Sequence, residues 1–343
     1  MTVLYVQEQG AVVRRTAELI KVTKRPARQR KDTVLNSIAV HELEQVVVYG
    51  NVQLTTQAAA LLLQKNVDVV FLSFGGKFLF RLVNAEGGKF GKLRHAQLQL
   101  SGDDARSLTV AKAIVRAKLA NQRNLLQRLG EGIASTHAAL LVQAAQSIDQ
   151  MRTAAARATD ADSLRGFEGR AGATYFGSLK SLLDVRWLFQ GRAYHPPPDP
   201  FNALLSFGYA LLLKDLTATI QIVGLDPYLG CFHTLEYGRP SLTLDLMEEF
   251  RPLVVDEIVL QWVLGGKIKP EDFTLTGQAE QPVLLGEKQL PLFITAYEKR
   301  LDEVVQHNPS QSRQKLRRCF ELQARIYARV VMETRAEYEG LVG

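Results

Sequence analysis

The chain has 343 residues, of which 46% are hydrophobic and 22% are charged, and its formal net charge is +7. These values exclude an intrinsically disordered protein and favour one large globular domain or two ordinary ones. The positive charge favours an acidic partner such as nucleic acid, although charge alone identifies none.

The first 85 residues show the short apolar runs that are typical of β-strands, separated by glycine-containing turns. We predict strands over residues 3–6, 45–49, 67–73 and 78–83. One helical pattern interrupts them over 56–65, with Thr55 or Thr56 as its N-cap. The sequence therefore predicts a small strand-rich domain over 1–85.

A segment with glycines and lysines, 86–100, is predicted to be a linker. After it the apolar residues follow helical spacing, and a long helix is expected from 101–104 to about 129, with acidic residues in its first turn. Further helices are predicted over 137–157, 162–189, 202–223, 227–236, 242–264, 291–307 and 310–339. The proline-rich run 196–200 is predicted to be a rigid connection without helix. The fold class is therefore α+β, with a small N-terminal β-rich domain followed by a larger all-α C-terminal domain over 101–343.

The N-terminus has no basic region before a long apolar stretch, so no signal peptide is expected. The apolar runs are too short to cross a bilayer, and we expect a soluble, cytoplasmic protein. Cys231 and Cys319 are the two cysteines, and they lack the paired spacing of a disulfide framework or a zinc–thiolate site.

Three residues of the C-terminal half, Glu168, His233 and Glu248, are candidates for a metal site. Two carboxylates and one imidazole can hold a divalent cation and leave positions open for water and substrate. Asp245 lies three residues before Glu248 and would share its helix face. His233 is expected about two turns into a helix that starts at Asp226.

Taken singly, these residues have plainer interpretations. A lone glutamate on a helix is more often solvated, and a lone histidine is more often a surface or core residue than a ligand. Asp245, Glu248 and Glu249 in one helical turn would more often form a solvated acidic face. Spacing alone does not bring Glu168 and His233 together.

Several longer strings surround these residues: VVVYGNVQLTT at 46–56, VVFLS at 69–73, FEG at 167–169, DPFNALLSFGY at 199–209, GLDPYLG at 224–230 and RPSLTLDLME at 239–248. In this order they resemble the family of CRISPR-associated endonuclease/integrases known as protein 1 of the adaptation module (Cas one). The resemblance runs nearly from end to end of the chain.

The resemblance implies an N-terminal β-domain that makes dimer or partner contacts and a helical catalytic domain. It also implies a homodimer, two of which flank a dimer of the small CRISPR-associated protein 2 in a hetero-hexamer that inserts spacer DNA into a CRISPR array, as antiviral defence. The metal ligands of the family fall on Glu168, His233 and Glu248, for Mg²⁺ or Mn²⁺. Asp245 matches a further acidic position of the active site. Some members of the family have Asp where Glu248 stands.

Double-stranded DNA is then the expected substrate, both as spacer precursor and as repeat. The candidates for phosphate contacts are Arg165, Arg170, Arg186, Arg192 and Arg239. Two other functions remain open from the residues: a stand-alone metal-dependent nuclease acting on branched DNA, and a DNA-binding scaffold subunit without catalysis. Dependence on a free 3′-hydroxyl separates an integrase from a nuclease.

Overall fold

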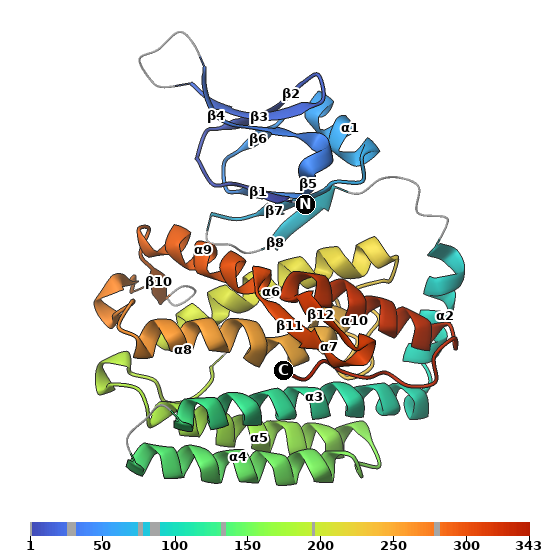
Figure 1. Ribbon diagram of the computed structural model, residues 1–343, viewed down its shortest axis with the longest axis vertical. Helices are drawn as coiled ribbons and strands as arrows, with labels where there is room; N and C mark the ends of the chain where they lie inside the picture. The colour runs from blue at the N-terminus through green and yellow to red at the C-terminus, as the bar shows by residue number, and fades with distance from the viewer. Residues whose placement is uncertain are drawn as a thin grey trace. The chain divides into compact units, whose positions relative to one another are not determined.

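The computed structural model describes residues 2–25, 32–74, 78–82, 90–131, 135–193, 196–277 and 282–343. The chain forms two compact units, Met1–Lys89 and Phe90–Gly343 (Figure 1). We refer to them as the strand unit and the helical unit. This mixed architecture, strand-rich first and mostly helical afterwards, confirms the coarse prediction from the sequence.

The strand unit contains two four-stranded sheets. The first has β1 (Thr2–Val6), β5 (Leu43–Tyr49), β7 (Asp68–Leu72) and β8 (Phe78–Leu82) in that order. The first three strands run parallel and β8 runs antiparallel to β7. The second has β4 (Thr33–Ala39), β3 (Leu19–Lys24), β2 (Val12–Thr16) and β6 (Gln53–Leu54). Valine, leucine and isoleucine side chains of both sheets and of the unit's helix form the core of the strand unit, among them Val13, Ile20, Val46, Val48 and Leu62.

All four predicted strands of the strand unit are observed, and so is the helix α1 (Thr56–Gln64). Thr55 is its N-cap, because its side chain accepts a hydrogen bond from the amide of Ala58. The strands β2, β3, β4 and β6 were not predicted. Their sequences mix polar with apolar residues and most of their side chains are exposed or half-buried, so they lack the apolar run that marks the other strands.

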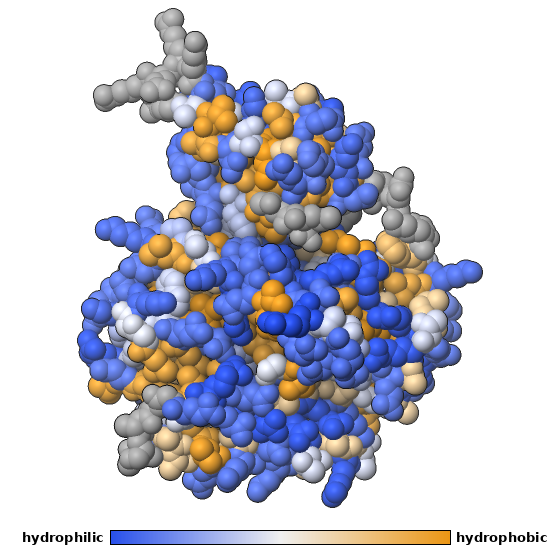
Figure 2. Space-filling model, viewed as in Figure 1, coloured by the Kyte–Doolittle hydropathy of each residue, from blue (hydrophilic) through white to orange (hydrophobic). Residues whose placement is uncertain are grey.

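The helical unit has nine α-helices among the described residues: α2 (Gly91–Ser101), α3 (Asp104–Glu131), α4 (Ser135–Ala155), α5 (Ala161–Lys180), α6 (Pro200–Val223), α7 (Ser241–Phe250), α8 (Glu257–Leu264), α9 (Gln289–Asp302) and α10 (Leu316–Val331). The helices α3, α4 and α5 lie side by side, and α7 contacts both α3 and α6 (Figure 1). Polar residues cover most of the face seen in Figure 2, with apolar patches interspersed.

The prediction of an all-α C-terminal domain was wrong in one respect. Two short hairpins lie in it, β9 (Phe273–Leu275) with β10 (Val283–Leu285), and β11 (Val304–His307) with β12 (Ser312–Lys315). Their strands have only three or four residues, too few for an alternating pattern to stand out in the sequence. Short helical turns complete the unit: Val185–Trp187, Pro270–Asp272 and Asn308–Ser310; the strand unit has one at Val40–Glu42.

Residues 91–101 form α2, although a linker was predicted over 86–100. Residues 86–89 lie outside the described part of the chain. The helix packs Leu93, Ala96 and Leu100 on the core, and it is also fixed by a polar contact: Gln97 is fully buried, and its amide donates to the carbonyls of Asp226 and Leu229, 2.8 and 2.9 Å away. A buried glutamine that anchors a helix gives no apolar signal in the sequence.

The helix α6 forms the centre of the helical unit. Its first residue is Pro200, so the proline-rich run is helical at its last position; a proline is tolerated there because the first helical amide has no partner. Asp199 caps this end, and Gly224, with φ of 98°, ends the helix in the left-handed conformation. By length and hydropathy α6 would cross a membrane, but 78% of its most apolar window is buried inside the unit. We therefore describe it as a core helix.

The predicted helix over 242–264 is continuous but not uniform. Between α7 and α8, residues Arg251–Asp256 form a π-helix, in which hydrogen bonds span five residues. Pro252 gives a physical reason: it has no amide hydrogen, and in an α-helix its ring would collide with the carbonyl of Glu248. A wider turn relieves this collision.

Candidate metal centre

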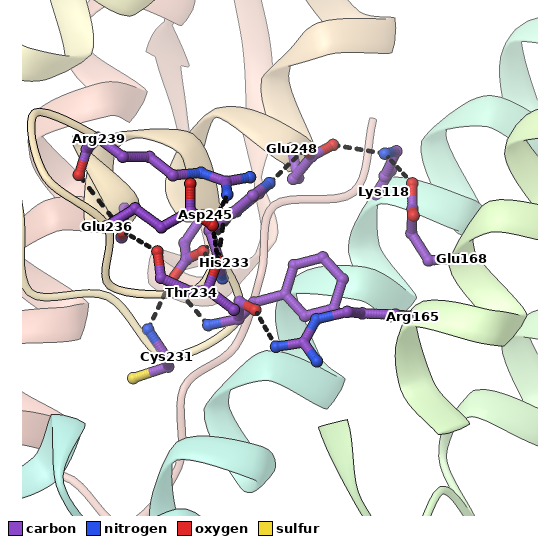
Figure 3. Close-up of polar contacts among 12 residues, drawn as sticks. Lys118, Arg165, Glu168, Cys231, His233, Thr234, Glu236, Arg239, Asp245 and Glu248 are labelled. Carbon is purple, nitrogen blue, oxygen red and sulfur yellow. Dashed lines mark hydrogen bonds and ion pairs between the residues drawn. The ribbon is translucent and has the colours of Figure 1, made fainter. Parts of the chain in front are cut away.

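Two helices and one loop bring the three predicted metal ligands to one place in the helical unit. Glu168 comes from α5, Glu248 from α7 and His233 from the loop between α6 and α7. The ammonium group of Lys118, which comes from α3, lies between the carboxylates of Glu168 and Glu248, and His233 lies on the other side of Glu248 (Figure 3). Lys118 Nζ lies 2.5 Å from Glu168 Oε1 and 2.5 Å from Glu248 Oε2. His233 Nε2 lies 3.6 Å from Glu248 Oε1.

His233 lies in a loop and not in the predicted helix over 227–236. The loop is held by the fully buried carboxylate of Asp245. This carboxylate accepts hydrogen bonds from the backbone amides of Cys231, Phe232 and His233 at 2.6, 3.0 and 2.9 Å. These amides would otherwise need helical or solvent partners, so one side chain replaces the hydrogen bonds of a helical turn.

Gly230 permits this close approach. A Cβ atom at this position would lie 2.6 Å from Asp245 Oδ2 and 2.7 Å from the backbone of Ser241. Any other residue would therefore push the loop away from α7.

Asp245 also orients the ring of His233. Its Oδ1 lies 2.7 Å from His233 Nδ1, so that nitrogen donates to the carboxylate and Nε2 faces Glu248. Histidine ligands of metals are commonly held in this way by a carboxylate on the other ring nitrogen. Asp245 thus positions His233 instead of facing the cation position itself.

Among the described residues, no group of three His, Cys, Asp or Glu side chains is close enough together to hold a metal as it stands. The Lys118 ammonium lies between Glu168 and Glu248, in the position that a shared cation would take. The donor set nevertheless fits Mg²⁺ or Mn²⁺. It has two carboxylates and Nε2 of His233, whose ring Asp245 already holds through Nδ1.

The electrostatics around Glu248 favour its ionised form. Burial raises the pKa of a carboxyl group, but the charges of Arg251, Lys118 and His233 outweigh burial and lower the pKa of Glu248 to about 2. One guanidinium nitrogen of Arg251 lies 3.4 Å from Glu248 Oε1. The carboxylate is therefore charged at neutral pH, as a metal ligand must be.

The π-helix places two further polar side chains beside the site. Arg251 lies over the ring of Tyr209, with 4.8 Å between the guanidinium carbon and the ring centroid. Asp256, five residues later, accepts hydrogen bonds from the hydroxyls of Tyr209 and Tyr175, at 2.5 and 2.9 Å. Burial raises the pKa of Asp256 to about 6, although the two hydrogen bonds lower it.

A cavity of about 460 Å³ adjoins the site. Its lining includes Lys118 and Glu168 on one side and Arg192, Tyr209 and Arg251 on the other. On its α5 side the lining includes Gly169, Gly172 and Gly177, and no atom lies within 4 Å of a Cβ added at any of the three. The cavity has space on its α5 side, and its lining carries three basic side chains and two acidic ones, Glu168 and Asp256.

The five arginines predicted to contact DNA differ in their surroundings. Arg165 pairs with Asp162 and donates to the carbonyl of Phe232, beside His233 (Figure 3). Arg239 is on the same loop as His233, where it pairs with Glu236.

The other three arginines lie elsewhere on the unit. Arg192 donates to Asn202 and lines the cavity. Arg170 is exposed on α5, within 5.0 Å of the ring of Phe167. Arg186 forms ion pairs with Asp184 and Glu271, which makes it the weakest phosphate contact of the five.

The sequence alone did not single out Lys118, Arg251 or Asp256. For Lys118 a signal exists, because it falls on the stripe of α3 that carries Ala111, Ile114 and Leu125, all buried. A lysine on an apolar face either has its stem covered or meets a buried carboxylate. For Arg251 and Asp256 no such signal exists, since their positions depend on the π-helix.

Comparison with known sequences identifies relatives. The sequence model of the family described as CRISPR associated protein Cas1 matches residues 4–299. The chain is 34% identical to the CRISPR-associated endonuclease Cas1 3 of Thermus thermophilus, over 98% of this chain and 96% of that one. It is 35% identical to a CRISPR-associated exonuclease Cas4/endonuclease Cas1 fusion of Geobacter sulfurreducens, over 95% of this chain but 57% of the fusion. The chain thus spans little more than half of the length of that relative.

Two solved structures have the same fold. A casposase bound to integration product matches with a TM-score of 0.78 and 19% identity, over 99% of this chain and 93% of that one. A chain of a Cas6-RT-Cas1–Cas2 complex matches with a TM-score of 0.80 and 22% identity, over 99% of this chain and 36% of that one. At these identities the likeness concerns the fold.

Proposed function

This chain belongs to the family of CRISPR-associated Cas1 proteins, and on that basis we propose that it is a metal-dependent DNA endonuclease and integrase. It would join spacer DNA to a CRISPR array during adaptation, which serves antiviral defence. The observation that carries the proposal is the row of contacts in which Lys118 links Glu168 to Glu248 and Glu248 lies beside His233. The relatives named as Cas1 endonucleases and the casposase with its integration product support the same class of reaction.

The reaction is a transesterification. The 3′-hydroxyl oxygen of a spacer end bonds to a phosphorus atom at the repeat boundary, and the bond from that phosphorus to its old 3′-oxygen breaks. The attacking hydroxyl loses a proton, and the departing oxygen gains one. A bound Mg²⁺ or Mn²⁺ would polarise the phosphoryl oxygen and stabilise the developing charge.

The residues of the chain have separate roles in this proposal. Glu168, His233 and Glu248 would hold the cation, and Asp245 keeps Nε2 of His233 directed at it. Arg251 stands beside Glu248 and lines the neighbouring cavity, where its positive charge suits a phosphate. Arg165 and Arg239 would contact the DNA backbone outside the site.

The assembly is part of the proposal as well. We propose a cytoplasmic homodimer that associates with CRISPR-associated protein 2 in a hetero-hexamer, with the strand unit making the dimer or partner contacts. The Cas1–Cas2 content of one solved structure with this fold supports the partnership.

The test is a strand-transfer assay. A short duplex with free 3′-hydroxyls is mixed with a supercoiled plasmid that carries repeats, in Mg²⁺ or Mn²⁺, with and without the small partner. We expect covalently joined product from the wild type, none from His233→Ala or Glu248→Ala, and none from a donor with blocked 3′ ends. His95→Ala is the matched control, because His95 is exposed on α2 and belongs to no part of the site.

Other outcomes separate the alternatives. Nicking of branched DNA without joining, indifferent to the donor end, would identify a stand-alone nuclease. DNA binding without any cleavage or joining, unchanged by chelation, would identify a scaffold subunit.

A further inference from the structure

Lys118 occupies the place between the two carboxylates where the proposed cation belongs. Its ammonium is within 2.5 Å of one oxygen of Glu168 and of Glu248, and its side chain is 8% exposed. We propose that Lys118 is a built-in counter-ion that fills the cation position of the metal-free protein and must leave it for a divalent metal to bind. This inference rests on the proposed function, because it takes these carboxylates as metal ligands.

A counter-ion is needed here on energetic grounds. Glu248 is buried and Glu168 is half-buried, so carboxylates brought together here repel each other and lose part of their hydration, and a cation or a proton offsets this cost. Lys118 supplies the cation from a helix different from those of both carboxylates. The site can therefore fold in its final arrangement before any metal is present.

A lysine suits this role better than an arginine. The ammonium is a compact point charge on a flexible four-carbon stem, whereas a guanidinium would hold a carboxylate with two hydrogen bonds in a fixed plane. The neighbouring cavity offers Lys118 a second position, since Lys118 lines it and the glycines of α5 leave it open. The lining there gives the displaced ammonium one other carboxylate, that of Asp256, beside the like charges of Arg192 and Arg251.

Lys118 thus makes metal binding an exchange. The positive charge of Lys118 moves from the carboxylates into the cavity as the divalent cation takes its place. The apparent affinity for the metal is then the intrinsic affinity multiplied by the fraction of protein in which Lys118 has left the site. An ion pair that only stabilised the fold would have no such effect on the affinity.

The experiment measures Mn²⁺ binding to the full chain without DNA, by calorimetric titration, together with the thermal midpoint with and without Mn²⁺. We expect Lys118→Met to bind Mn²⁺ about 10-fold more tightly than the wild type. Its midpoint should fall below that of the wild type in chelator and should rise more on addition of Mn²⁺. Arg123→Met is the matched control, because it removes another ion pair of α3, with Asp149, and should leave Mn²⁺ affinity unchanged.

Lys118→Gln provides a second variant of the same kind if the methionine variant does not fold, and a variant that folds only with Mn²⁺ would also support the exchange. Unchanged or weaker Mn²⁺ binding by a folded Lys118 variant overturns the inference. If joining by the wild type still depends on metal in that case, the proposed function stands and the exchange alone fails. If neither protein binds Mn²⁺ and joining needs no metal, both fail.

Discussion

Glu248 and Glu249 are neighbours on α7 and both are buried, yet their surroundings shift the pKa values of their carboxyl groups in opposite directions. Around Glu248 the charges of Arg251, Lys118 and His233 outweigh burial, and the pKa of its carboxyl group falls to about 2. Burial dominates at Glu249 and raises the pKa of its carboxyl group to about 7. The partners of Glu249 are neutral donors: the hydroxyl of Tyr338 at 2.7 Å, the amide of Gln323 at 3.1 Å and the backbone of Leu341 at 2.6 Å.

The difference shows that burial does not decide what a carboxylate does. One face of α7 places Glu248 among charged side chains, where we propose a cation site. The other face anchors residues 338–341 through a neutral network, which stabilises the helix that carries Glu248. The dipeptide Glu-Glu in the sequence says nothing of this division.

The largest expected effect separates the two faces by activity. Glu248→Gln should lower the rate of strand transfer by roughly 10²–10³-fold, because an amide keeps the shape of the side chain but removes the charge that holds the cation. Glu249→Gln should retain most of the rate, since its neighbours are neutral. Equal losses in the two variants, measured under the same metal and DNA conditions, would end the distinction between the faces.

The second prediction uses the pH dependence of stability. In the unfolded chain Glu249 titrates near 4.5, whereas in the folded protein its carboxyl pKa is about 7, so between these values the folded state keeps a proton that the unfolded state has lost. Stability linked to Glu249 is therefore full below pH 4.5 and is lost as the pH rises through about 7. The free energy of unfolding of the wild type, relative to Glu249→Gln, should fall by roughly 3 kcal/mol between pH 4 and pH 8.

Urea unfolding of both proteins in chelator measures this difference, and Glu248, present in both, cancels from it. A difference that stayed flat would mean that folding leaves the pKa of Glu249 unchanged, and one that rose with pH would mean that folding lowers it. The two faces of α7 would then share one electrostatic environment.

The third prediction concerns the support of the site face. Asp245→Ala should weaken Mn²⁺ binding by about 10–100-fold, because the ring of His233 and the loop amides lose their acceptor. Calorimetric titration measures the affinity. Glu236→Ala, which removes an exposed acid from the same loop, should leave it unchanged. Equal effects of the two would point to general loop damage.

The smallest expected effect lies at the rim of the site. Arg165→Gln should lower the slope of log affinity for duplex DNA against log salt by about one unit, if Arg165 contacts one phosphate. Arg186→Gln should leave the slope unchanged, since Arg186 is already paired with two carboxylates. Affinity titrations at several salt concentrations compare them, and identical slopes for the wild type and Arg165→Gln would remove Arg165 from the interface.

Much of the architecture followed from periodicity alone. The apolar strands of the strand unit and the helices α3, α4 and α6 carry their own patterns, so each was predicted close to its observed place, whereas α5 ends at Lys180 and not at the predicted residue 189. The errors occur where tertiary contacts replace local signals. Gln97 fixes α2 through carbonyls more than a hundred residues away, and Asp245 keeps the His233 segment out of a helix that Pro227 seemed to start.

The candidate site divides in the same way. Glu168, His233 and Glu248 came from the resemblance to a family, because no spacing connects residues on separate segments. The structure links Glu168 to Glu248 through Lys118 and places His233 beside Glu248, while their role as metal ligands stays a prediction. Lys118 was within reach of a helical-face argument, but Arg251 and Asp256 owe their places to hydrogen bonding that the sequence does not display.

The π-helix has a consequence for how the chain tolerates changes in length. Removing Pro252 would let the backbone return to α-helical hydrogen bonding, and the helix after it would rotate by about 100° relative to α7. Val259 and Trp262 of α8 would then turn away from their present neighbours, while Glu248 stayed in place. A surface loop absorbs a deletion of one residue, but here the site upstream and the core downstream cannot both keep their partners.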